Sequence, residues 1–92
     1  MKALLIRRIK EVYGRGVIEG VIWEVPKPVP PSAHRIKYRL AYVVEGNRLV
    51  GYDNERGKGD HKHIGAVEAP YRFKDVPTLI RDFLRDVKEV ES

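Results

Sequence analysis

IKYRLAYVV (residues 36–44) decides the fold, because its side chains alternate in character with a period of two. Successive side chains of a strand point to opposite faces, so the aromatic residues lie on one face and Lys37 and Arg39 lie on the other. The stretch therefore predicts a strand in a sheet that has one apolar face and one basic face.

The chain after this strand predicts a hairpin and then a helix. Residues 45–47 form a turn, and residues 48–53 form a strand that pairs antiparallel with residues 36–44. Near the C-terminus, Asp75 can cap a helix whose apolar residues recur at spacings of three and four. These apolar residues are Val76, Leu79, Ile80, Phe83, Leu84 and Val87. The polar side of the helix, which includes Asp86, is expected to face solvent.

The chain before residues 36–44 predicts a second hairpin and a stiff connector. The apolar runs 4–12 and 17–25 flank Tyr13-Gly14-Arg15-Gly16, whose glycines can adopt the positive φ of a tight hairpin loop. Residues 17–25 are rich in β-branched side chains and predict a strand. Residues 4–12 could also line one face of a helix, and the hairpin turn alone favours a strand. The prolines of residues 26–31 predict an extended connector within the domain.

The length and composition predict one domain. The chain has 92 residues, and its hydrophobic fraction of 42% suffices for one modest core. We therefore expect a single α+β domain over residues 1–92. Its antiparallel sheet is expected to be a meander of about four strands, with the C-terminal amphipathic helix packed on one face.

The composition also restricts the kinds of site and partner. The chain contains no cysteine, which excludes disulfides and thiolate chemistry and is typical of a reducing compartment, so we expect a cytoplasmic protein. No stretch approaches the roughly 20 apolar residues that span a bilayer, so no membrane association is expected. The formal charge is +5, with the excess in the N-terminal half, and this charge predicts a face that attracts RNA, DNA or an acidic protein segment.

The residues predicted to carry the function lie in the polar segment YDNERGKGDHKH, residues 52–63. His61 and His63 are two positions apart, so both point to the same side of an extended backbone. Histidine titrates near neutral pH, which allows one ring to act as a base and the other as an acid. Lys58 lies between two glycines, and these let the backbone bring its ammonium group close to an anion.

Cleavage of RNA without a metal is the favoured hypothesis for this segment. One histidine would deprotonate the 2′-hydroxyl and the other would protonate the leaving 5′-oxygen, while Lys58 or Arg56 stabilises the charge on phosphorus. Asp53 would orient a histidine or favour its charged form. No cofactor is expected for this chemistry. The residues expected to bind substrate are Arg56, Asn54, Lys37 and Arg39.

Two further hypotheses use the same segment. His61 and His63 could bind Zn²⁺ or Mn²⁺ together with the carboxylate of Asp60 or Asp53, which would make the protein a metal-dependent hydrolase or nuclease. Alternatively, the protein is a non-enzymatic module whose basic face docks nucleic acid or the ribosome. A solvated hairpin loop without a function is the simplest structural alternative.

The remaining aromatic and histidine residues favour structural roles. Trp23, Tyr38 and Tyr42 could stack on bases, but aromatic residues at strand period are core residues more often than a stacking platform. His34 follows the proline connector and is expected to be a surface or strand-entry residue without a catalytic role.

Four parts of the chain together resemble one toxin family. They are the Gly-x-Gly hairpin, VIEGVIWEVPKPVPPSAHRIKYRLAYV, GYDNERGKGDHKH, and PYRF before the C-terminal helix. This arrangement resembles the TumE family of small toxins from prokaryotic toxin–antitoxin operons over nearly the whole chain. The resemblance implies a helix-turn-helix antitoxin and RNA as partners and a suspected ribonuclease activity, with a homodimer left open. The matched motif positions are Asp53, Asn54, Lys58, His61 and His63.

Overall fold

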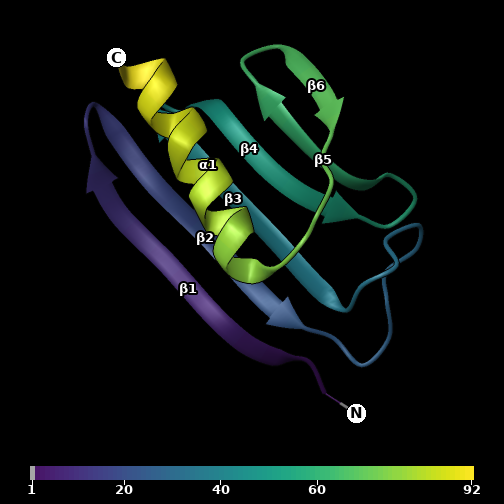
Figure 1. The fold of residues 1–92 in the computed structure, drawn as a ribbon. Helices are drawn as coiled ribbons and strands as arrows, with labels where there is room; N and C mark the ends of the chain where they lie inside the picture. The colour runs from purple at the N-terminus through teal and green to yellow at the C-terminus, as the bar shows by residue number, and fades with distance from the viewer. Residues whose placement is uncertain (1) are drawn as a thin grey trace.

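The computed structural model describes residues 2–92 as one antiparallel sheet of six strands with a helix on one face (Figure 1). The elements are β1 (Leu4–Tyr13), β2 (Gly16–Glu24), β3 (Ile36–Val44), β4 (Asn47–Glu55), β5 (Gly59–Ile64), β6 (Val67–Pro70) and α1 (Val76–Glu91). The strands neighbour one another in chain order, so the sheet is a meander. The predicted α+β class and C-terminal helix are confirmed, but the expected number of about four strands is wrong.

The two additional strands come from a region that the sequence interpretation left outside the sheet. β5 and β6 form a hairpin that extends the sheet beyond β4. Polar residues have a low intrinsic preference for strands, and here pairing with β4 overrides that preference. Gly57 and Gly59, with φ of +87° and +76°, turn the chain back along β4. At the N-terminus, residues 4–12 are a strand, as the hairpin turn favoured.

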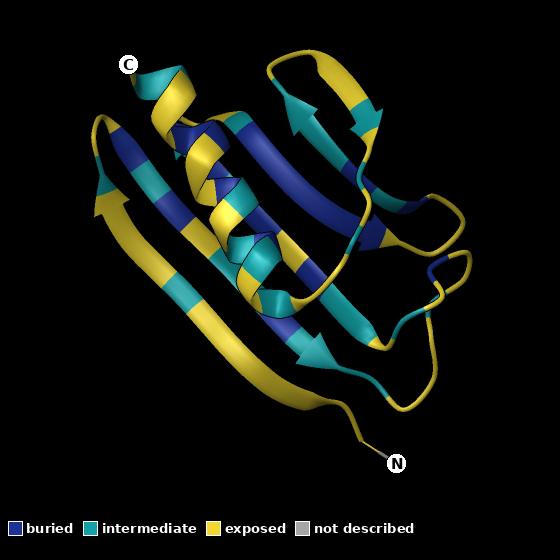
Figure 2. Cartoon of the chain, viewed as in Figure 1, coloured by how far each residue is buried: buried dark blue, intermediate teal, exposed yellow. Residues whose placement is uncertain are grey.

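The hydrophobic core lies between α1 and the middle of the sheet. α1 packs against β3 and β4, and Figure 2 shows buried residues beneath the helix and an exposed β1. The core residues are Ile18, Ile22, Tyr38, Leu40, Tyr42, Val44, Val50, Tyr52, Leu79, Phe83 and Val87. The predicted cap is confirmed, because Asp75 accepts a hydrogen bond from the backbone N–H of Thr78 at 2.8 Å.

Two side chains of α1 differ from the predicted pattern. Leu84 belongs to the apolar stripe but is 38% exposed, because it lies at the margin of the covered area. Asp86 is buried and not solvated. Its carboxylate accepts hydrogen bonds from the Tyr52 hydroxyl and from Lys62, whose Nζ lies at 3.3 Å. These donors from the sheet compensate for the loss of water around the charge.

The pairing register assigns each strand residue to one of the two faces of the sheet. We call the face that α1 covers the helix face and the opposite one the open face. Arg39, Asp53 and His61 are directly opposite one another on β3, β4 and β5, and they lie on the open face. Asn54 and Asp60 are paired with each other and lie on the helix face. Asp60 and His61 are neighbours in sequence, yet the sheet separates their side chains.

Among the described residues, no helix has both the length and the apolar character needed to cross a membrane.

Candidate functional site

Asp53, His61 and His63 meet on the open face because β4 and β5 are paired in the required register. Asp53 is directly opposite His61, and His63 is two residues farther along the same strand. The two imidazole rings have centroids 5.0 Å apart and cross at 78°. Nitrogen and oxygen atoms of the three side chains lie within 4.8 Å of one another. The structure therefore brings together the two histidines, which strand parity predicted to share a side, and Asp53, which was expected to orient one of them.

Glu68 on β6 completes this cluster, and the sequence interpretation did not include it. Its Oε2 lies 3.5 Å from Nε2 of His61 and 3.6 Å from Nε2 of His63. Glu68 is paired with His63 across a tight turn in which Gly65 has φ of +60°. Gly65 between the short runs 59–64 and 67–70 was the signal that could have predicted the hairpin. We call Asp53, His61, His63 and Glu68 the Asp53 cluster.

Lys58 lies at the edge of the Asp53 cluster. Its Nζ is 4.0 Å from Oε2 of Glu68, and its side chain is mostly exposed. Lys58, His61 and Glu68 contribute to the lining of an open hollow of about 300 Å³. An anion in this hollow would lie within reach of the ammonium group. Arg56 is exposed in the turn between β4 and β5.

The contacts of His61 determine where its protons lie. Nδ1 lies 2.9 Å from the carbonyl oxygen of Gly59, and because a carbonyl only accepts hydrogen bonds, Nδ1 carries a proton. Nε2 lies 2.6 Å from Oδ1 of Asp53. This contact is close, yet it is not aligned as a hydrogen bond, and within residues 2–92 the buried oxygen has no hydrogen-bond donor. A proton or a cation between the two atoms would satisfy both of them, because a neutral ring directs a lone pair at the carboxylate.

Arg39 and Lys37, the residues predicted to bind substrate, lie beside the cluster on the open face. Arg39 is directly opposite Asp53, and both line a hollow of about 290 Å³ together with Trp23. Lys37 also lines this hollow, and its Nζ donates a hydrogen bond to the carbonyl oxygen of Asn54 at 2.6 Å. Trp23 is therefore a half-buried residue of the open face, and its expected place in the core is wrong. Tyr38 and Tyr42 are core residues as predicted.

Asn54 and Asp60 do not reach the Asp53 cluster. Asn54 is 1% exposed on the helix face, where its Nδ2 donates to the Ile36 carbonyl at 2.7 Å and its Oδ1 accepts from the Tyr38 N–H at 3.0 Å. Asn54 is thus part of the pairing between strands. Asp60 also points to the helix face, so the carboxylate beside the two histidines belongs to Asp53.

Asp60 belongs to a second polar cluster on the helix face. Its carboxylate accepts hydrogen bonds from the Ser32 hydroxyl, from the Tyr38 hydroxyl at 2.7 Å and from Nε2 of His34 at 2.7 Å. Nδ1 of His34 accepts a hydrogen bond from the Ile36 N–H, so the proton of the ring lies on Nε2. We call Ser32, His34, Tyr38 and Asp60 the Asp60 cluster. His34 therefore has a structural role that the sequence did not predict.

The charges of the Asp60 cluster follow from these hydrogen bonds. Burial alone would raise the pKa of Asp60, but donation from Ser32, Tyr38 and His34 holds this pKa below its usual range. Burial and the bond to the carboxylate raise the pKa of Tyr38 far above its ordinary value. The Phe73 ring stacks on His34 with centroids 4.0 Å apart and helps to shield the cluster.

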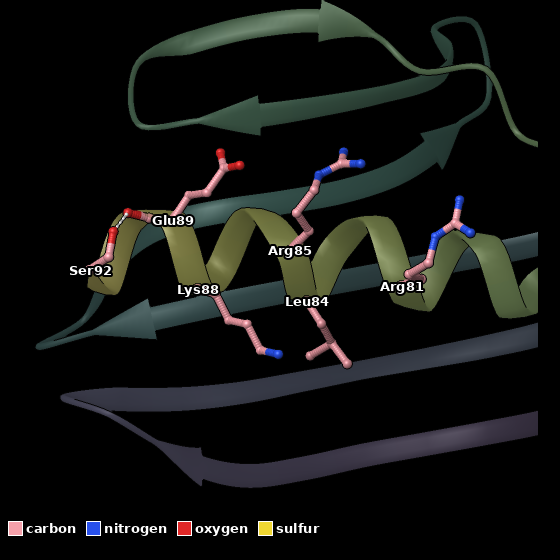
Figure 3. A pocket seen from close by; sticks show the side chains of 6 residues that line it. All are labelled: Arg81, Leu84, Arg85, Lys88, Glu89 and Ser92. Atoms are coloured by element: carbon pink, nitrogen blue, oxygen red, sulfur yellow. Dashed lines mark hydrogen bonds between the residues drawn. The ribbon is translucent and has the colours of Figure 1, made fainter.

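Another hollow, on α1, lies away from this cluster and lacks converging groups. It measures about 530 Å³ and follows the outer side of α1. Figure 3 shows that Leu84 and Lys88 point to one side of the helix, whereas Arg81, Arg85 and Glu89 point to the other. No histidine lines it. Acid–base chemistry is therefore better supported at the smaller hollow beside the Asp53 cluster.

Comparison with known protein families identifies the chain. A family model described as Toxin TumE matches residues 5–91, which include both polar clusters. No curated protein and no solved structure matches the sequence. The family is defined by the toxin of a toxin–antitoxin system, so an antitoxin is the implied partner. The chain belongs to the TumE toxin family and is the toxin component of such a system.

Proposed function

We propose that this toxin is an endoribonuclease that needs no metal ion. The observation that carries the proposal is the convergence of His61 and His63 on Glu68, with both Nε2 atoms within 3.6 Å of its Oε2, beside an open hollow that His61 and Glu68 help to line. Imidazole and carboxylate groups at this separation can exchange protons with a bound substrate. RNA carries its own nucleophile, the 2′-hydroxyl, so the protein needs only to move protons and stabilise charge.

The exposure of each group supports a division of roles. The side chain of His61 is 7% exposed and both of its nitrogens have neighbours, whereas those of His63 and Glu68 are 18% and 47% exposed. Glu68 and His63 are therefore the groups that contact substrate. His61 is held in place by Asp53 and by the carbonyl of Gly59. Its role is to place the partly positive edge of its ring beside the carboxylate of Glu68.

The proposed reaction is a transesterification. Glu68 accepts the proton of the 2′-hydroxyl, and the 2′-oxygen forms a bond to phosphorus. The bond from phosphorus to the 5′-oxygen breaks, and this oxygen takes a proton from the His63 imidazolium. Lys58 stabilises the charge that develops on the phosphoryl oxygens. Glu68 must turn away from His63 to admit the phosphate, which its exposed side chain permits.

The test is an assay of the purified toxin, free of antitoxin, on labelled RNA in the presence of EDTA. We expect fragments that end in a 2′,3′-cyclic phosphate. His63→Ala, purified in parallel, controls for a contaminating nuclease, and Lys88→Ala on the outer side of α1 controls for handling of a variant. RNA that stays intact with wild-type toxin, whether EDTA or a divalent metal is present, rejects the proposal.

A metal-dependent nuclease is the second candidate, and one observation favours it. The buried Oδ1 of Asp53 lacks a hydrogen-bond donor within residues 2–92, and a cation bound by Asp53, His61 and His63 would satisfy it. The separation of two of these ligand atoms argues against a metal ion. Ligand atoms about 2.1 Å from a tetrahedral Zn²⁺ lie about 3.4 Å apart, but Nε2 of His61 and Oδ1 of Asp53 are 2.6 Å apart.

The same assay separates the two candidates. Cleavage that stops on addition of EDTA and returns with Zn²⁺ or Mn²⁺ supports the metal site. Cleavage that continues in EDTA supports proton transfer by the side chains alone. Asp53→Asn should abolish metal rescue in the first case, because it removes one of the three ligands.

A further inference from the structure

A basic trough crosses the open face of the sheet beside the Asp53 cluster. It is a hollow of about 450 Å³ between β1 and β4. Four cationic side chains line it, and they are Arg8, Lys10, Arg39 and Arg48. Its floor is formed by small and apolar residues such as Val21 and Ala41, and Glu19 is the single acidic residue in the lining. We call this hollow the basic trough.

Arg48 connects the trough to the catalytic histidines because of the glycine that it covers. Gly51 is directly opposite Ala41 on one side and His63 on the other. A Cβ atom at Gly51 would lie 2.8 Å from Cδ and 3.0 Å from Nε of Arg48. The side chain of Arg48 therefore lies across the backbone of β4 at the position beside His63. Only a glycine leaves space for a guanidinium group there.

Arg39 connects the trough to a second hollow. It lines both the basic trough and the smaller hollow that contains Trp23, Lys37 and Asp53. Cations therefore follow one another from β1 to the edge of the Asp53 cluster, and one half-buried indole ring lies beside them. Alternating cations and an aromatic surface are the features with which proteins bind single-stranded nucleic acid.

We propose that the basic trough binds the sugar–phosphate backbone of single-stranded RNA and directs it to His63, with Arg48 as the phosphate-binding residue next to the histidine. This inference rests on the proposed ribonuclease function. A single strand is favoured because its 2′-oxygen can rotate into line with the leaving 5′-oxygen, which the regular geometry of a duplex prevents. An unpaired base can also stack on Trp23.

The test measures binding of a fluorescent, single-stranded 2′-O-methyl RNA in EDTA over a series of salt concentrations. This RNA has no free 2′-hydroxyl, so the proposed reaction cannot cut it. Each contact between a cation and a phosphate contributes a slope of roughly 0.7 in log K against log salt for single strands. Arg48→Ala and Lys10→Ala should each lower the slope by about 0.7, which is about fivefold weaker binding at 0.1 M salt.

Gly51→Ala is the sharpest variant, because it leaves every charge in place. The three nearest neighbours of the new Cβ are all atoms of the Arg48 side chain, which is flexible and can move aside. The variant should fold with an unchanged melting temperature and weaken RNA binding about as much as Arg48→Ala. Lys88→Ala, which removes a charge on the helix side of the molecule, should leave binding unchanged.

Three results would contradict the proposal that the basic trough binds single-stranded RNA. The first is that the protein does not bind RNA, and the second is that Arg48→Ala and Lys10→Ala bind RNA as tightly as wild type. The third is that a duplex of the same sequence binds with equal affinity. An acidic peptide that binds more tightly than RNA and with the same sensitivity to these variants would assign the trough to a protein partner. If the toxin cuts ordinary RNA but the variants leave KM unchanged, the RNA-binding role of the basic trough is rejected and the proposed ribonuclease activity is retained. If RNA binds as expected but is never cut, the ribonuclease activity is rejected and the RNA-binding role of the basic trough is retained.

Discussion

The two polar clusters lie on opposite faces of the same strands, and they differ in how completely their hydrogen bonds are satisfied. In the Asp60 cluster, both carboxylate oxygens accept hydrogen bonds, and both nitrogens of His34 have partners. In the Asp53 cluster, Oδ1 of Asp53 lacks a hydrogen-bond donor within the described residues. Glu68 contacts both histidines but is half exposed.

We infer from this difference that the Asp60 cluster is structural and that the Asp53 cluster carries the proposed function. A satisfied buried network stabilises one arrangement of the chain. The Asp60 cluster does this for the proline connector, whose Pro30 carbonyl also accepts a hydrogen bond from the N–H of Gly57 at 2.9 Å. An unsatisfied group costs stability and persists where it serves binding or chemistry. The Asp53 cluster fits that description.

A matched pair of substitutions should produce the largest contrast. His63→Ala is expected to reduce RNA cleavage by roughly 10²- to 10⁴-fold, the usual contribution of a general acid, with little change in stability. His34→Ala should leave cleavage per folded molecule within a few-fold of wild type and lower the free energy of unfolding by about 1–3 kcal/mol, because Asp60 loses a donor. Initial rates and urea unfolding measure both quantities. Equal losses of cleavage in the two variants would contradict the assignment.

Asp60→Asn should be the most destabilising polar change in the Asp60 cluster. An amide cannot accept from Ser32, Tyr38 and His34 at once, and its N–H₂ group would face a donor. We expect a loss of about 2–4 kcal/mol in the free energy of unfolding. Glu89→Gln on the outer side of α1 is the control and should change stability by less than about 0.5 kcal/mol. A stable Asp60→Asn variant would show that the network contributes little.

The alternation of the sequence predicted which face of the sheet a strand residue occupies, but it did not predict that Glu68 and Arg48 join the site. The alternation in residues 36–44 placed Arg39 correctly, and parity placed His61 and His63 together. The position of Glu68 in the site depends on β6, and this strand of four residues is too short for the sequence alone to predict it. Arg48 joins the open face because the pairing of β3 with β4 shifts register next to it and because Gly51 has no side chain. Such features depend on three-dimensional packing, which local propensity does not contain.

The Asp60 cluster should also make the fold sensitive to acid. Hydrogen bonds hold the pKa of Asp60 below its usual range, so it is lower in the folded than in the unfolded state. A depressed pKa contributes stability that is fully present above the unfolded value, about 3.9, and is lost as the pH falls towards the lower folded value. Urea unfolding between pH 6 and pH 2 should therefore show stability falling below about pH 4. Asp60→Asn should make this fall shallower, and an unchanged slope would assign the acid sensitivity to other carboxylates.

Asp53→Asn should have the smallest effect on stability. The sign of its change in the free energy of unfolding should be opposite to that of Asp60→Asn or close to zero, which distinguishes the two clusters. In the wild-type protein the buried Oδ1 of Asp53 lies 2.6 Å from Nε2 of His61 without an aligned hydrogen bond, so this contact contributes little to stability. An asparagine can donate from its amide to Nε2, so the variant should be as stable as wild type or more stable by up to about 1 kcal/mol. RNA cleavage should fall, because His61 no longer keeps a positively polarised ring beside Glu68. Clear destabilisation at pH 8 would mean that the pair is a persistent ion pair, and the Asp53 cluster would then resemble the Asp60 cluster in being structural.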